Sequence, residues 1–179
     1  MQLENYTKYR LKPAEELAAV LAQADNIFVF SCNKCFKEFE TAYEPDCDAF
    51  IKIAQDLGKT VTGCAKADFL CNKTKAEKAM QSIIPEGTEA IVVISCGLGI
   101  QTIASLTELP VYAATNSLNY TGHHGMALTK KACDACAQCY LNITGGICPI
   151  VDCSKSLING QCGGAKDGKC EVSPDKDCA

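Results

Sequence analysis

The stretch Glu89-Ala-Ile-Val-Val-Ile94, followed by Ser95-Cys-Gly-Leu-Gly99, decides the fold of the first part of the chain. Its continuous run of apolar, β-branched residues predicts a strand that is buried on both faces. The glycine-containing loop leads into a helix predicted over residues 100–106, and another strand is predicted over residues 109–114. Buried strands that alternate with helices are typical of a parallel sheet.

The same alternation extends over the residues before Thr121. Pro13 opens an amphipathic segment with acidic residues in its first turn, as expected at the start of a helix. Helices are predicted over residues 13–24, 48–57 and 73–84, and strands over residues 27–30 and 59–62. We therefore expect an α/β domain over residues 1–125, with a small doubly wound parallel sheet of the flavodoxin- or Rossmann-like kind.

Cysteine dominates the rest of the chain. Fourteen of the 179 residues are cysteine, and eight of them fall in the last part of the sequence: Cys133, Cys136, Cys139, Cys148, Cys153, Cys162, Cys170 and Cys178. The run opens with C-x-x-C-x-x-C, which suits a cubane because each iron corner takes one thiolate. Eight thiolates meet the requirement of two [4Fe–4S] clusters. We expect an irregular, cysteine-rich iron–sulfur domain over residues 126–179, with one short helix over residues 126–140.

The division of these thiols between two clusters can be argued from ferredoxins. Cys148-Pro149 resembles the Cys-Pro pair that follows the ferredoxin run and ligates the other cluster. One assignment therefore joins Cys133, Cys136 and Cys139 to the remote Cys178. The second cluster then takes Cys148, Cys153, Cys162 and Cys170. Zinc remains the alternative, because C-x-x-C pairs also bind a single tetrahedral ion.

A third metal site is one reading of the cysteines in the α/β part. Three predicted strands each end at a cysteine, and parallel strands bring their carboxyl ends to one edge of the sheet. The strand-end cysteines are Cys32, Cys64 and Cys96, and Cys35 forms a C-x-x-C pair with Cys32. These four residues are the candidate ligands. Packing explains them equally well, because cysteine is a common small buried residue. Cys47 and Cys71 lack this placement and are expected to be structural.

The remaining motifs are weak. The adjacent His123 and His124 are flanked by glycine and are better explained as a polar loop than as metal ligands. The loop after Cys96 lacks the full G-x-G-x-x-G nucleotide-binding pattern, because residue 102 is threonine. No nucleophile–base pair is recognisable, so we expect no catalytic residues in this chain.

Composition and charge indicate the cellular compartment and exclude some classes of binding partner. The N-terminus has no basic and apolar signal pattern, and no apolar run approaches the length of a membrane span. We therefore expect a cytoplasmic protein whose thiols stay reduced rather than forming disulfides. A net charge of −4 without a basic patch argues against nucleic-acid binding.

Four short motifs resemble a known family. They are residues 144–149 (TGGICP), 153–157 (CSKSL), 159–164 (NGQCGG) and 168–172 (GKCEV). In combination they resemble the cysteine-rich domain of the small, MetV-type subunit of acetogen methylenetetrahydrofolate reductase. The likeness covers roughly the last third of the chain. Gln161 departs from the family's usual proline, and the tryptophan that often follows the final Cys-Ala is absent after Ala179.

The resemblance implies an iron–sulfur electron-transfer subunit that is no enzyme by itself. Such a subunit would pass electrons from ferredoxin, or from a pyridine-nucleotide-oxidising subunit, to a flavin-containing catalytic subunit. That partner reduces methylenetetrahydrofolate to methyltetrahydrofolate in the Wood–Ljungdahl pathway of one-carbon metabolism. Two other hypotheses stay open: a zinc-stabilised scaffold of the same complex, and an enzyme that binds a corrinoid or a nucleotide at the edge of the sheet.

Overall fold

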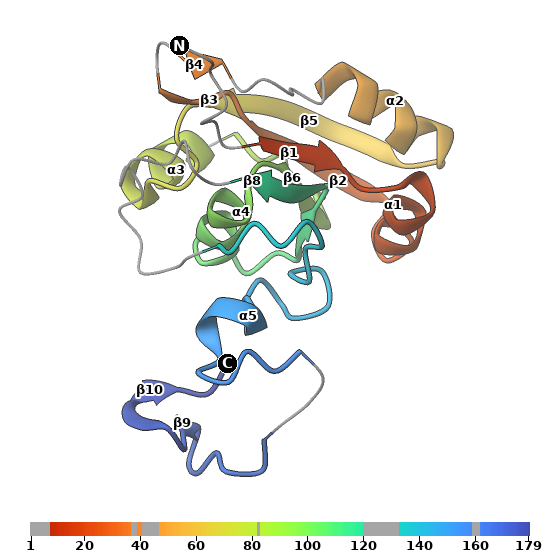
Figure 1. Ribbon diagram of the computed structural model, residues 1–179. Helices are drawn as coiled ribbons and strands as arrows, with labels where there is room; N and C mark the ends of the chain where they lie inside the picture. The colour runs from red at the N-terminus through yellow and green to blue at the C-terminus, as the bar shows by residue number, and fades with distance from the viewer. Residues whose placement is uncertain (1–7, 37–38, 41–46, 82, 120–132, 159–161) are drawn as a thin grey trace.

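A four-stranded parallel sheet forms the centre of the computed structural model (Figure 1). The structure describes residues 8–36, 39–40, 47–81, 83–119, 133–158 and 162–179. The sheet has the order β5-β2-β6-β7. Its strands are β2 (Asn26–Cys32), β5 (Thr60–Ala67), β6 (Ala90–Ile94) and β7 (Val111–Ala113). Counted along the chain, this order is 2-1-3-4, which is how a flavodoxin-like sheet begins.

Helices cover both faces of this sheet. Alternate residues of a strand point to opposite faces, and Val29 and Val92 pack in one apolar cluster while Phe30 and Val93 pack in the other. The first cluster includes side chains of α1 (Ala14–Leu21) and α2 (Cys47–Asp56). The second includes side chains of α3 (Lys73–Met80) and α4 (Gly97–Ala104). The doubly wound α/β fold expected from the sequence is confirmed.

Two details differ from the expectation. Strand β5 continues to Ala67, well beyond the predicted end at residue 62. Gly63 lies within this strand, where a Cβ atom would lie 2.9 Å from the ring of Phe28. The glycine therefore allows a close approach of the backbone to Phe28 and does not mark the end of the strand. In addition, β1 (Lys8–Leu11) pairs antiparallel with β8 (Thr115–Asn119), a ribbon that the sequence did not predict.

The C-terminal part contains little regular structure. Its described elements are α5 (Pro149–Asp152) and a hairpin of β9 (Lys169–Cys170) with β10 (Ser173–Asp177). They lie below the sheet in Figure 1, away from the α/β part. A two-stranded ribbon, β3 (Lys34–Phe36) with β4 (Phe39–Glu40), completes the described elements. Among the described residues, no helix has the length and apolar character that crossing a bilayer requires.

The expected helix over residues 126–140 is not formed in its described part. Residues 120–132 lie outside the described residues, and residues 133–140 contain no helix. Ala135 and Ala137 have positive φ angles of 49° and 61°. Left-handed backbone is uncommon outside glycine and does not continue a right-handed helix. The C-x-x-C-x-x-C run therefore turns between its cysteines.

The central sheet depends on Phe30, whose side chain is only 1% exposed and packs edge-on against Phe28. We expect Phe30→Ala to lower the free energy of unfolding by about 3–5 kcal/mol, because the truncation leaves a cavity. Ile143→Ala is the control: Ile143 is 78% exposed, and its truncation should change stability by no more than about 0.5 kcal/mol. Anaerobic urea denaturation of the full chain measures both values. Equal losses in the two variants would contradict this account of the core.

Candidate metal centres

Four cysteines line a hollow at the boundary between the α/β part and the C-terminal part. They are Cys133, Cys136, Cys139 and Cys148, and we call this place the first hollow. Gly97 and Gln101 of α4 and Ser117 of β8 line it from the other side. The first hollow is therefore built by both parts of the chain.

Backbone and amide contacts hold the cysteine segment on the sheet. The Asn142 side chain accepts a hydrogen bond from the backbone N–H of Ala113 (2.6 Å) and donates one to its carbonyl (3.1 Å), which extends the edge of β7. The N–H of Ala137 donates to the carbonyl of Ser117 (2.9 Å). Leu141 is buried in the apolar cluster that also contains side chains of α4. This docking fixes residues 133–148 against β7, β8 and α4.

The start of α4 lies directly against one thiol. A Cβ atom at Gly97 would lie 2.7 Å from Cys133 Sγ, well inside van der Waals contact. The N–H of Gly97 donates to Ser117 Oγ (2.8 Å). The glycine that sequence reasoning linked to a weak nucleotide-binding pattern thus allows the helix to approach Cys133.

Burial and amide hydrogens set the charge state of the first hollow. Burial raises the pKa of the Cys139 thiol to about 11, and the N–H of Leu141 and the ammonium of Lys12 offset part of this effect. Burial also raises the pKa of Cys148, where the N–H groups of Val151 and Ile150 act in the opposite direction. The raised values disfavour bare thiolates here, so a positively charged metal group is what would favour deprotonation.

A second hollow lies within the C-terminal part. It is lined by Cys153, Cys162, Cys170 and Cys178, together with residues that include Asp152, Lys155 and Glu171. The N–H groups of Leu157 and Lys155 lower the pKa of Cys153. The Ser154 hydroxyl, 3.5 Å from the sulfur, and the N–H of Val172 lower the pKa of Cys170. Thiolates are favoured more strongly here than in the first hollow.

The two hollows divide the eight cysteines differently from the sequence-based assignment. Cys148 lines the first hollow with the C-x-x-C-x-x-C run, and Cys178 lines the second. The N-cap of α5 is Cys148 and its C-cap is Cys153, so this single helical turn sends one cysteine to each hollow. The analogy with ferredoxins placed Cys148 and Cys178 the other way round.

Each hollow offers four thiols, and backbone N–H groups point at thiols in both. Across the described residues, no three histidine, cysteine or acidic side chains are grouped closely enough to hold a single metal ion. Thiols spaced around a hollow suit a [4Fe–4S] cluster, in which each iron takes one thiolate and N–H groups donate to sulfur. The residues present therefore fit a cubane.

The cysteines of the α/β part are not gathered into a comparable hollow among the described residues. Cys32 ends β2 and packs in the cluster with Phe30, whereas Cys96 is the N-cap of α4 and packs in the opposite cluster. Cys64 lies in the middle of β5, and its Sγ is 3.3 Å from Sγ of Cys47 at the start of α2. None of the described cysteines forms a disulfide.

The other residues considered from the sequence are placed as follows. Cys71 is buried in the same apolar cluster as Cys47 and Cys96. The side chain of Cys35 and both histidines, His123 and His124, lie outside the described residues. Two residues that bind the backbone of Cys139 were missed by sequence reasoning: Lys12 and Asn116. Neither belongs to a motif, and their position depends on the β1–β8 ribbon.

One four-cysteine hollow against the α/β sheet and a second within the C-terminal part make this chain a candidate thiolate-ligated metal protein. Residues 112–179 match the family described as methylene-tetrahydrofolate reductase C terminal, a range that runs from β7 through both hollows. The match covers less than half of the chain. It supports a relation to methylenetetrahydrofolate reductase. No curated protein and no solved structure matches this chain.

The Cys47–Cys64 contact predicts an unreactive thiol at the surface. Cys64 is exposed, yet burial of its sulfur and the neighbouring Cys47 raise its pKa to about 12 from 9.0. At neutral pH it therefore stays protonated, with a thiolate fraction roughly a thousandfold below that of an unshifted cysteine. Its greater nucleophilicity as a thiolate recovers part of this difference. We expect alkylation by iodoacetamide that is slower by on the order of tenfold or more.

Mass spectrometry of the Cys64 peptide after timed alkylation measures this rate. Cys47→Ala removes the neighbouring sulfur and its hydrogen bond, so the pKa of Cys64 should fall and its alkylation should speed up. An equally fast reaction in both proteins, at the rate of an ordinary exposed cysteine, would contradict the contact.

Proposed function

We propose that this protein is an iron–sulfur electron-transfer subunit that delivers electrons to the flavin of methylenetetrahydrofolate reductase. One observation carries the proposal: the region that matches the reductase family contains two hollows, each lined by four cysteines. A [4Fe–4S] cluster supplies one-electron transfer when bound. The chain's own residues provide the thiols, donate N–H groups to sulfur and partly bury Cys139.

The spacing of the hollows supports a relay. Cys148 and Cys153 cap the two ends of α5, and the four residues of this helix rise by only about 6 Å. Two clusters bound at these positions are close neighbours. Transfer of electrons is the chemistry that these donor sets favour.

The exposure of the cysteines differs between the two hollows and suggests which of them contacts a partner protein. Cys136 is the one exposed cysteine of the first hollow and its other three are partly buried, whereas both Cys162 and Cys178 are exposed at the second. A groove of about 290 Å³ shares Cys153, Cys162 and Cys178 with the second hollow, and the exposed apolar residues Ile147, Leu157 and Ile158 border it. We propose that the flavin-containing subunit contacts the chain at the second hollow. Ferredoxin or a pyridine-nucleotide-oxidising subunit would be the electron donor.

Metal and sulfide analysis after anaerobic purification tests the proposal. We expect about eight irons and eight sulfides per chain, the content of two [4Fe–4S] clusters. Cys148→Ala should remove the cluster of the first hollow and Cys178→Ala that of the second, so each variant should keep about four irons. Cys64→Ala is the matched control, and it should keep all of them.

Two results would contradict this expectation. Stoichiometric zinc without sulfide would favour a zinc-stabilised scaffold of the same complex. A third cluster, with about twelve irons per chain, would show that the cysteines of the α/β part also bind iron. Electron paramagnetic resonance of the reduced Cys148→Ala and Cys178→Ala proteins identifies which spectrum belongs to which hollow.

The close approach at Gly97 gives an independent prediction. Gly97→Ala places a methyl group 2.7 Å from Cys133 Sγ, so the thiol must move and the first hollow should lose its cluster. We expect iron to fall by about four per chain while the second cluster stays. Gly58→Ala is the control, because Gly58 has a φ of 76° but nothing within 4 Å of its Cβ position. The control should lower stability and keep all iron, and equal iron loss in both variants would count against the contact.

A further inference from the structure

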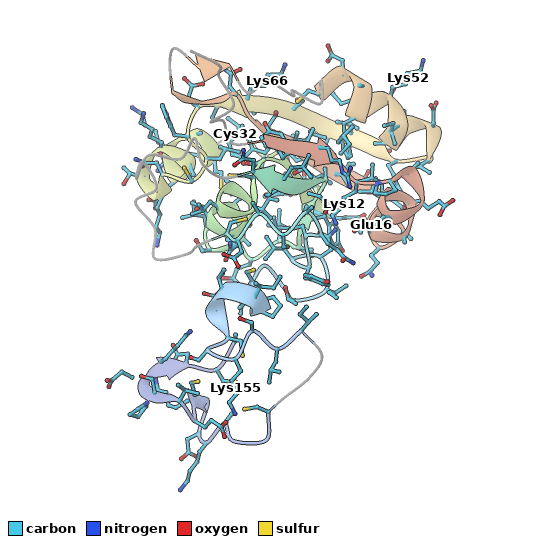
Figure 2. The ribbon with its side chains drawn as sticks, viewed as in Figure 1. Lys12, Glu16, Cys32, Lys52, Lys66 and Lys155 are labelled. Atoms are coloured by element: carbon cyan, nitrogen blue, oxygen red, sulfur yellow. The ribbon has the colours of Figure 1, made fainter. Side chains whose placement is uncertain are left out.

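Lys12 is a buried cation next to the first hollow. It follows β1, and its side chain is 0% exposed. Its ammonium donates to Asn116 Oδ1 (2.9 Å) and to the carbonyl oxygen of Cys139 (3.1 Å), and it pairs with the carboxylate of Glu16. Figure 2 shows Lys12 and Glu16 side by side next to α1. These three acceptors match the three N–H donors of an ammonium.

The same acceptor connects Lys12 to the backbone of Cys139. Asn116 Oδ1 also accepts a hydrogen bond from the N–H of Cys139 (2.8 Å). Lys12 and Asn116 therefore bind both polar groups of the Cys139 peptide backbone, from β1 and β8. This arrangement fixes the position of Cys139 relative to the sheet.

The charge of Lys12 requires an explanation beyond packing. An ammonium is costly to remove from water, and a methionine or leucine would fill the same space without that cost. Its carboxylate partner does not cancel the charge fully at the hollow, because Glu16 is 41% exposed and screened by solvent.

The second hollow has no equivalent. Lys155 lines this hollow and forms an ion pair with Glu171. Both side chains are partly exposed, at 41% and 33%. The partly buried Lys176 acts on Cys170 from nearby. Among the described residues that line the two hollows or bind their cysteine backbones, a fully buried cation is found only at the first. The two places therefore offer different electrostatic environments to identical donor sets.

We propose that Lys12 is a positioning residue that fixes Cys139 and raises the reduction potential of the cluster in the first hollow. This inference rests on the proposed function. Reduction adds one electron to the cluster and makes it more negative, and a fixed positive charge nearby stabilises that reduced form. Because the charge is buried, salt screens its effect only weakly. The second cluster lies outside these contacts and keeps its own potential.

A redox titration of the full chain, monitored by electron paramagnetic resonance with dithionite as reductant, tests the proposal. The spectrum missing in Cys148→Ala identifies the first cluster. In Lys12→Met we expect an unchanged iron content and a tenfold lower ratio of reduced to oxidised first cluster at a fixed potential, about 59 mV for one electron. Lys12→Arg should restore most of the wild-type value. Lys52→Met, on the exposed side of α2, is the control and should change neither cluster.

Glu16→Gln removes the negative partner of Lys12 and should therefore shift the reduction potential in the opposite direction to Lys12→Met. Glu16 is partly exposed, so this variant should fold normally even where Lys12→Met does not. Removing the counter-charge should raise the potential of the first cluster and leave the second unchanged. An unchanged first potential in Glu16→Gln, or in an iron-replete Lys12→Met protein, would overturn the role of Lys12. Absence of iron and sulfide in the wild-type chain would instead overturn the proposed function itself.

Discussion

The docking of residues 133–148 onto the edge of the sheet is the contact on which the rest of the structure depends. The Asn142 side chain binds both backbone groups of Ala113, and Asn116 binds the backbone of Cys139. A cysteine-rich segment without helices or strands cannot bury enough apolar surface to order itself. Here its hydrogen bonds to β7 and β8 hold it in place. The first hollow exists because an irregular segment is held against a rigid sheet.

This docking also explains why the two hollows differ although both offer four thiols. The first lies against the core, so burial raises the pKa of Cys139 and Cys148. The fully buried Lys12 supplies a positive charge beside it. The second depends on local amides and a hydroxyl, which lower the pKa of Cys153 and Cys170. One site is shaped by desolvation and the other by hydrogen bonding. The distinction follows from position in the fold.

Local sequence pattern predicted the sheet and its helices well. Strand β6 and helix α4 were evident because apolar, β-branched residues precede a glycine loop and a helical segment. The eight C-terminal cysteines were evident from their spacing. Their grouping was not, because the chain reverses direction between Cys148 and Cys178 and no local pattern records that path. Lys12 was equally hidden, since its burial follows from the pairing of β1 with β8, over a hundred residues away.

The short helix α5 has a consequence for the geometry of both hollows. Because its two caps are cysteines that face different hollows, a movement at one end of this rigid turn is transmitted to the other. A group bound at one end would therefore restrict the geometry of the cysteine at the other end. The two hollows thus have separate linings but share one short backbone segment, so their geometries are coupled through α5.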